Sequence, residues 1–119
     1  MSDYAKTLLI DIDGTLCVHE PPELATHPDH VMELLPGSAD RLRRWHEAGH
    51  LIILATGRAE SKRAITVKQL EQAGLVYDQL VMGLTRGKRI LINDCKPDGT
   101  VTVAAYALPR NSGIAHVNE

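Results

Sequence analysis

Short apolar runs alternate along this chain with segments that have helical periodicity. The apolar runs lie at residues 7–10, 51–55, 77–82, 89–94 and 100–108. Runs of this length, bounded by polar and turn-forming residues, are typical of strands in a largely buried sheet. Between them, Ser38 is placed to cap a helix that Gly49 ends, and residues 60–73 carry apolar side chains at helical spacing before Gly74. The pattern therefore predicts five strands and two helices.

The order of these elements predicts the fold class. Strands that alternate with helices form right-handed crossovers onto a parallel sheet. We expect residues 1–119 to form a single α/β domain, doubly wound and Rossmann-like, with a central, mainly parallel sheet, and 119 residues is an ordinary length for one domain. In such folds ligands bind where the strands end at their carboxyl edge.

Composition narrows the class of protein. The sequence is 44% hydrophobic and 24% charged, as in an ordinary soluble globule, and no apolar run reaches the roughly 18 residues of a membrane helix. The first residues lack the features of a signal peptide, so we expect a cytoplasmic protein that has no membrane partner. The net charge of −2 is spread without a basic stripe, which argues against a nucleic-acid partner. Cys17 and Cys95 are predicted to be free thiols.

Polar clusters follow three of the predicted strands, at residues 11–15, 56–58 and 93–96. Asp11 and Asp13 are one residue apart, and two carboxylates 4 Å apart repel by about 4 kcal/mol at an effective dielectric constant of 20. A bound cation or a shared proton relieves that repulsion. Asp94 would bring a third carboxylate to the same edge, and an all-oxygen cluster suits Mg²⁺. The alternative is that these aspartates are solvated turn residues.

Three of these segments carry a family resemblance. The stretches "DIDGT", "LATGR" and "ILINDCKPD", within residues 7–98, resemble the first, second and fourth motifs of the haloacid dehalogenase superfamily of phosphohydrolases. The resemblance implies that Asp11 is the nucleophile and Asp13 the general acid and base. It also implies that Mg²⁺ is held by the Asp11 carboxylate, the Asp13 backbone carbonyl and Asp94, and that Thr56 hydrogen-bonds the phosphoryl oxygens.

Further residues are candidates for binding the phosphate and the rest of the substrate. Gly14 lets the backbone approach a phosphate closely. Gly57 belongs to the same turn as Thr56, and Arg58 after it either reaches the distal part of the substrate or pairs with Glu60 at the surface.

The cation of the family's third motif has several candidates in "TRGKRILINDCK". We expect Lys88 to bind the phosphate, with Arg86, Arg89 and Lys96 as alternatives. Asp98 would then orient either a water molecule or Lys96.

Members of this superfamily often select substrates with a cap domain, and neither interval where caps are inserted has room for one here. Residues 17–35, stiffened by Pro21, Pro22 and Pro28, are the predicted local flap. We therefore expect a small, capless, Mg²⁺-dependent phosphatase that hydrolyses a phosphorylated sugar or related metabolite through an aspartyl phosphate, as a possible homo-oligomer. The alternatives are a non-catalytic module that binds phosphorylated ligands and a receiver-like phosphoacceptor domain.

Overall fold

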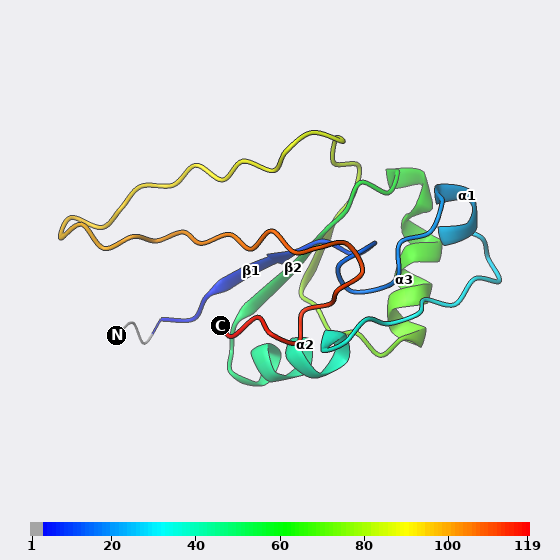
Figure 1. Ribbon diagram of the computed structural model, residues 1–119, viewed down its shortest axis with the longest axis horizontal. Helices are drawn as coiled ribbons and strands as arrows, with labels where there is room; N and C mark the ends of the chain where they lie inside the picture. The colour runs from blue at the N-terminus through cyan, green and yellow to red at the C-terminus, as the bar shows by residue number, and fades with distance from the viewer. Residues whose placement is uncertain (1–3) are drawn as a thin grey trace.

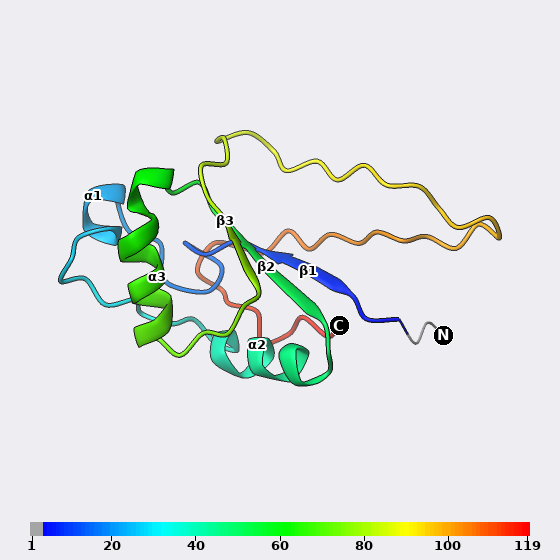
Figure 2. The same cartoon turned by 180° about the vertical axis from the view of Figure 1, so that it is seen from behind.

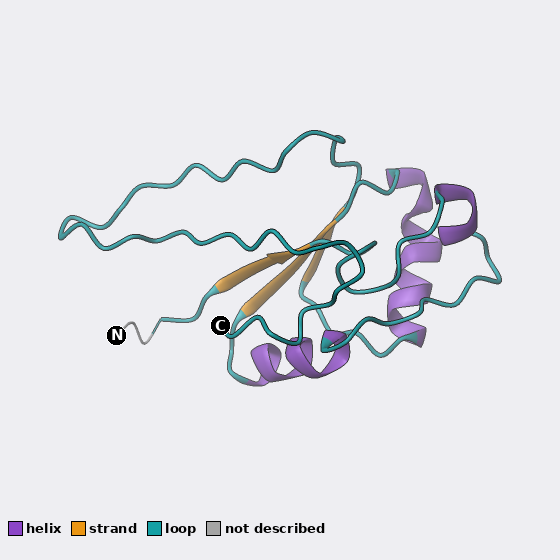
Figure 3. Ribbon diagram, viewed as in Figure 1, coloured by secondary structure: helices purple, strands orange, loops and turns teal. Residues whose placement is uncertain are grey.

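A parallel three-stranded sheet lies at the centre of the molecule. In the computed structural model, which describes residues 4–119, the strands are β1 (Thr7–Ile10), β2 (Leu51–Ala55) and β3 (Gln79–Val81). They lie in the order β1-β2-β3, and the register pairs Leu8 with Ile52 (Figures 1 and 3). The first three predicted strands and the parallel α/β class are confirmed. The doubly wound arrangement and the lack of a cap stay predictions.

Two ten-residue helices connect and cover the strands. They are α2 (Ser38–Glu47) and α3 (Arg63–Gln72), with the 3-10 turn η1 (Glu60–Lys62) leading into α3 (Figure 2). Gly49 and Gly74 follow the helix ends with φ of 86° and 73°, as expected of glycines that terminate helices. The predicted cap at Ser38 is wrong, because Ser38 is already helical and its Oγ donates to the Leu16 carbonyl oxygen at 2.6 Å. None of the helices between residues 4 and 119 has the length and apolar character needed to cross a bilayer.

The hydrophobic core joins the sheet to both helices and to the C-terminal segment. Its fully buried members are Ile12, Leu16, Leu42, Ile52, Leu54 and Leu70. Helix α2 packs against β2, and Ile114 and Val117 close the core from the far end of the chain. The predicted flap, residues 17–35, contains the short helix α1 (Pro22–Ala25), whose Ala25 is buried. The segment that follows β1 is therefore tied into the body of the protein.

Residues 85–108 form a long two-limbed arm that leaves this body (Figure 1, yellow to orange). The predicted strands at 89–94 and 100–108 are wrong, since neither segment pairs as a strand. The two limbs are tied near the tip, where the Lys96 N–H donates to the Thr100 carbonyl at 3.0 Å. The molecule measures 51 × 29 × 25 Å, and the arm runs along its longest axis (Figure 1).

The arm shows why apolar composition misled the strand prediction. Ile90 and Ile92 are 77% and 90% exposed, so their side chains are not packed in the hydrophobic core. Strand preference reflects packing against a neighbouring strand and a buried face more than any intrinsic backbone tendency. Within residues 4–119, β1 pairs with β2 alone, and the arm does not pair with its other edge.

The two thiols of the chain test this placement of the arm. Cys95 is exposed on the arm, whereas Cys17 is 2% exposed, and burial, aided by the Asp13 charge, raises the pKa of the Cys17 thiol to about 12. The thiolate is the reactive form, so we predict that Ellman's reagent titrates one thiol per native chain rapidly and the second only after denaturation. Cys95→Ser should abolish the fast phase, and Cys17→Ser should leave it unchanged. A slow Cys95 would mean that the arm is covered in solution.

Candidate functional site

The two aspartates flank a buried residue at the end of β1. Ile12 is fully buried in the core, and alternation along an extended chain directs Asp11 and Asp13 to the opposite side. A tight turn follows, in which the Ile12 carbonyl accepts the Leu16 N–H at 2.8 Å. Gly14, in this turn, has φ of 86°, a conformation that favours glycine. The sequence "DIDGT" therefore folds into a strand end and turn that hold both carboxylates at the carboxyl edge of the sheet.

A bidentate ion pair fixes Asp13. The Nε and Nη2 atoms of Arg58 donate to its two carboxylate oxygens at 2.8 and 2.9 Å, with the Arg58 side chain 5% exposed and that of Asp13 19%. Nη1 of Arg58 donates to Gln69 at 2.6 Å and to Thr66 at 3.1 Å. Four of the five guanidinium N–H groups are thus used inside the protein.

This arrangement answers one question that the sequence left open. Arg58 does not pair with Glu60, because Glu60 binds Arg63 at 2.6 Å. Burial acts to lower the Arg58 pKa, but the hydrogen bonds and charge of Asp13 raise it above its ordinary value. Arg58 is therefore a buried cation that positions Asp13, and its predicted contact with the distal part of a substrate stays untested.

Asp11 is less enclosed. It is part-buried, and burial raises the pKa of its carboxyl, while the Ile12 backbone N–H and the charge of Arg89 act in the opposite direction. The repulsion between the two aspartates is thus relieved by two arginines, Arg58 on Asp13 and Arg89 near Asp11. Among the four cations considered from the sequence, Arg89 is the one whose charge acts most strongly on Asp11, and the predicted phosphate binding by Lys88 stays a prediction.

Thr56 and Gly57 lie where β2 ends. Thr56 is 1% exposed, its backbone N–H donates to Val81 at 2.9 Å, and its hydroxyl oxygen accepts the Arg58 backbone N–H at 3.1 Å. The hydroxyl proton of Thr56 remains able to donate. Gly57 is exposed, and a Cβ there would lie 3.6 Å from the Leu84 carbonyl oxygen, which is ordinary contact. The predicted phosphate-binding roles of both residues stay predictions.

The structure does not bring Asp94 to this edge. Asp94 is exposed on the arm, where its carbonyl accepts the Thr102 hydroxyl at 2.6 Å. Across residues 4–119 no three His, Cys, Asp or Glu side chains gather as a metal site would require. The predicted Mg²⁺ ligand set of Asp11, Asp13 and Asp94 is therefore not assembled, because the strand that was to carry Asp94 does not form.

The other charged residues of the arm have local partners. Asp98 accepts the backbone N–H of Thr100 at 2.9 Å and its hydroxyl at 2.6 Å, and these bonds lower the Asp98 pKa. Lys96 lies over the Tyr4 ring, 4.8 Å from its centroid. The predicted orientation of Lys96 or of water by Asp98 has no counterpart here.

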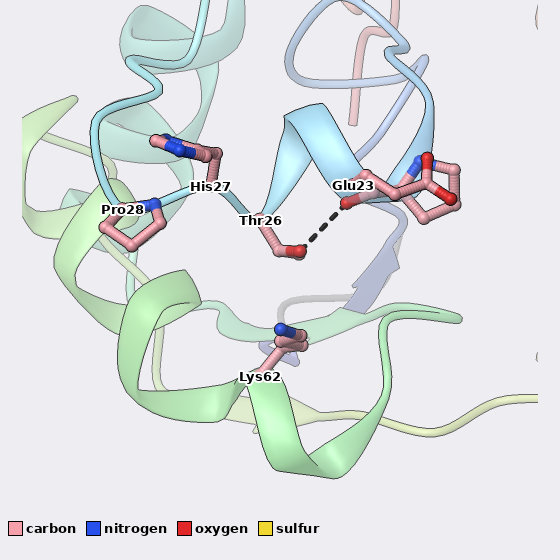
Figure 4. Close-up of a pocket in the computed structure, with 6 residues that line it drawn as sticks. Glu23, Thr26, His27, Pro28 and Lys62 are labelled. Carbon is pink, nitrogen blue, oxygen red and sulfur yellow. Dashed lines mark hydrogen bonds between the residues drawn. The ribbon is translucent and has the colours of Figure 1, made fainter.

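A separate hollow lies between α1 and η1 (Figure 4). Its volume is about 370 Å³, and it is lined by Pro22, Glu23, Thr26, His27, Pro28 and Lys62. The Thr26 hydroxyl donates to the Pro22 carbonyl at 2.8 Å and so closes α1 instead of facing a ligand. None of the predicted site residues lines this hollow, so the site is defined by the strand ends.

The sequence reasoning missed Arg110 and Asn111, which contact the turn after β1. The Asn111 N–H donates to the Gly14 carbonyl at 2.8 Å, and Arg110 packs on Gly14. The signal that could have found them is the turn-forming composition of "PRNSG", directly after the run at 100–108.

The ion pair predicts the effect of removing Arg58. Arg58→Met would leave Asp13 part-buried without its cation, and breaking a buried pair from one side costs about 3–5 kcal/mol. We expect chemical denaturation to show a loss of that size in the free energy of unfolding. The matched control, Arg63→Met, breaks an exposed pair and should leave the midpoint nearly unchanged. Equal effects of the two substitutions would contradict the dominance of the Arg58 pair.

No protein-family model matches this sequence, and no curated protein is closely similar to it. Solved structures do share its fold. A target protein from Vibrio cholerae is 22% identical with a TM-score of 0.55, over 95% of this chain and 89% of that one. A chain of the Pnkp1/Rnl/Hen1 complex is 28% identical with a TM-score of 0.56, over 72% of this chain and 31% of that one.

A third similar structure has a lower score. It is the D,D-heptose 1,7-bisphosphate phosphatase of B. bronchiseptica, complexed with magnesium and phosphate, at 24% identity and a TM-score of 0.46, over 65% of this chain and 49% of that one. The chain thus spans less than half the length of this protein and of the Pnkp1/Rnl/Hen1 chain. The likenesses with TM-scores of 0.55 and 0.56 support the α/β class.

Proposed function

We propose that this protein is a phosphatase that hydrolyses small phosphate monoesters through an aspartyl phosphate on Asp11. The observation that carries the proposal is the strand end at β1, where a part-buried Asp11 stands one residue from an Asp13 held by Arg58. The motif resemblance and the fold of the similar structures agree with it. Turnover would separate this function from a non-catalytic binding module.

The chemistry of the groups supports two displacements. An Asp11 oxygen attacks phosphorus and forms a P–O bond as the bond to the leaving oxygen breaks. That oxygen takes a proton from Asp13, which must first leave its ion pair with Arg58 and take up a proton from solvent. Water then attacks the aspartyl phosphate, Asp13 takes a proton from it, and Asp11 is released with inorganic phosphate. Because the transferring group spreads charge over three oxygens, positioned cations and donors stabilise it, and Arg89 and the Thr56 hydroxyl are the candidates.

The ion pair with Arg58 gives Asp13 a fixed place for this work. Both of its carboxylate oxygens accept hydrogen bonds from Arg58, so the pair holds the ionised form of Asp13, which is the form that takes a proton from the attacking water. A general acid must be positioned within hydrogen-bond reach of the atom that it protonates. Arg58 acts through Asp13 in this proposal and is a positioning residue.

Mg²⁺ belongs to the proposal as the sequence predicted it, but the arrangement described does not fit it. Asp11 supplies one carboxylate, the Asp13 side chain is committed to Arg58, and Asp94 is on the arm. A site for Mg²⁺ would need Asp94 to reach the edge of the sheet, so no step is assigned to the metal here.

The substrate class is part of the same proposal. A phosphorylated sugar or related metabolite is the substrate that we expect, because the charges of the chain form no basic stripe for a nucleic acid. Because the similar Pnkp1/Rnl/Hen1 assembly is an RNA repair complex, a phosphorylated oligonucleotide belongs in the substrate panel beside sugar phosphates. The cytoplasmic location and the homo-oligomeric state also stay proposals.

Replacing each aspartate separates their roles. Asp11→Asn removes the nucleophile, so we predict no turnover and no phosphoryl mass on the protein after acid quench. Asp13→Asn should lose about 10²–10⁴ in kcat on sugar phosphates, whose alkoxide needs a proton, and less on p-nitrophenyl phosphate. Turnover by Asp11→Asn, or a phosphoryl label on that variant, would show that Asp11 is not the nucleophile.

The metal requirement is tested apart from the nucleophile. If turnover uses Mg²⁺, a rearrangement has to bring Asp94 to the edge of the sheet, and chelator should then abolish hydrolysis while added Mg²⁺ restores it. If the arm delivers Asp94 during turnover, Asp94→Asn should raise the Mg²⁺ concentration needed for half-maximal activity, and Asp98→Asn on the same arm should not. Full activity in excess chelator would remove Mg²⁺ from the proposal.

A further inference from the structure

The C-terminal segment clamps the turn that follows the two aspartates. The Asn111 N–H donates to the Gly14 carbonyl at 2.8 Å, and the Asn111 Oδ1 accepts the His19 N–H at 2.8 Å. Asn111 therefore holds both ends of the residue 14–19 loop, one through its backbone N–H and the other through its side chain. The clamp comes from about ninety residues further along the chain, so nothing in the local sequence of the loop predicts it.

Asn111 adopts an unusual backbone conformation to do this. Its φ is 65°, the only positive φ of a non-glycine residue within residues 4–119. Asparagine tolerates the left-handed region better than most residues, but this backbone conformation still costs free energy. Residues in such conformations are found most often at functional sites. The turn is tightened by Ser112, whose N–H and hydroxyl reach the Pro109 carbonyl at 3.2 and 2.7 Å.

The consequence of this turn is the placement of Arg110. Its Cγ and Nε lie 3.2 and 3.7 Å from the position that a Cβ would take on Gly14. The side chain is exposed, and among the described residues its guanidinium makes no hydrogen bond or ion pair. This contrasts with Arg58, whose guanidinium is used almost completely inside the protein.

Arg110 is close to the site and yet does not serve the nucleophile. Arg110 contacts Gly14, the residue after Asp13, and no hydrogen bond or ion pair joins it to either aspartate within residues 4–119. A guanidinium that lies on the turn after the two aspartates, and has no partner within residues 4–119, is placed for a second anionic group of the substrate. Guanidinium groups bind carboxylate and phosphate through two parallel hydrogen bonds.

We propose that Arg110, held by the Asn111 turn on Gly14, is a specificity-determining residue that binds a second anionic group on the substrate. The proposal rests on the proposed function and narrows it to phosphate monoesters that carry a carboxylate or a further phosphate. Asn111 is the positioning residue, because it sets the backbone from which Arg110 reaches over Gly14.

The experiment compares two ligands of equal length, 3-phosphoglycerate and glycerol 3-phosphate, which differ in a carboxylate. Binding is measured by calorimetry in the Asp11→Asn background, so the result does not depend on turnover. We expect 3-phosphoglycerate to bind more tightly, and Arg110→Gln to weaken its binding about tenfold or more while glycerol 3-phosphate changes little. Arg110→Lys should recover part of the loss. The matched control Arg43→Gln, another exposed arginine, should change neither ligand.

Two further measurements complete the test. Asn111→Gly keeps the positive φ but removes the bond to His19, and it should weaken 3-phosphoglycerate alone. Comparing the binding of fructose 1,6-bisphosphate with that of fructose 6-phosphate tests whether a phosphate can serve as the second anionic group. Equal affinity for the ligands of both pairs, or loss of affinity for all ligands in Arg110→Gln, would overturn the proposal. Failure of the proposed function appears separately, as a wild-type chain that binds these ligands with the expected preference and hydrolyses none.

Discussion

The buried ion pair between Arg58 and Asp13 is the interaction on which the rest of the site depends. It joins the turn after β1 to the turn after β2, and Gln69 and Thr66 extend it to α3. Gln69 in turn donates to the Ala25 carbonyl at 2.8 Å, so α1 belongs to the same network. Polar groups in such a network are costly to leave unpaired, which is why all of these elements are held in one arrangement.

The same pair explains how two neighbouring aspartates are accommodated at one strand end. Asp13 is neutralised internally, which leaves Asp11 as the carboxylate that faces outward with Arg89 nearby. Two chemically identical side chains thus obtain different environments from the elements around them.

The sequence predicted those parts of the structure that local patterns determine. Apolar runs ending in polar clusters located β1 and β2, and Gly49 and Gly74 marked the helix ends. It could not predict what depends on a distant partner. The apolar run around Ile92 has the pattern of a buried strand, but in the structure it pairs with no strand and is exposed. Asp94 lies on the same arm and is therefore away from the two aspartates of the site. Arg58 could equally have paired with Glu60, and only the tertiary arrangement decides for Asp13.

The arm and the unpaired edge of β1 together affect how copies of this chain associate with one another. The outer edge of β1 has unpaired backbone N–H and C=O groups. The apolar arm is a segment that could pair with this edge as an added strand. The arm bears Arg86, Lys88, Arg89 and Lys96 against two aspartates, and the remainder of the chain is acidic, so these charges do not oppose the contact. Within one molecule the contact extends the sheet; between molecules it is a route to strand exchange and aggregation.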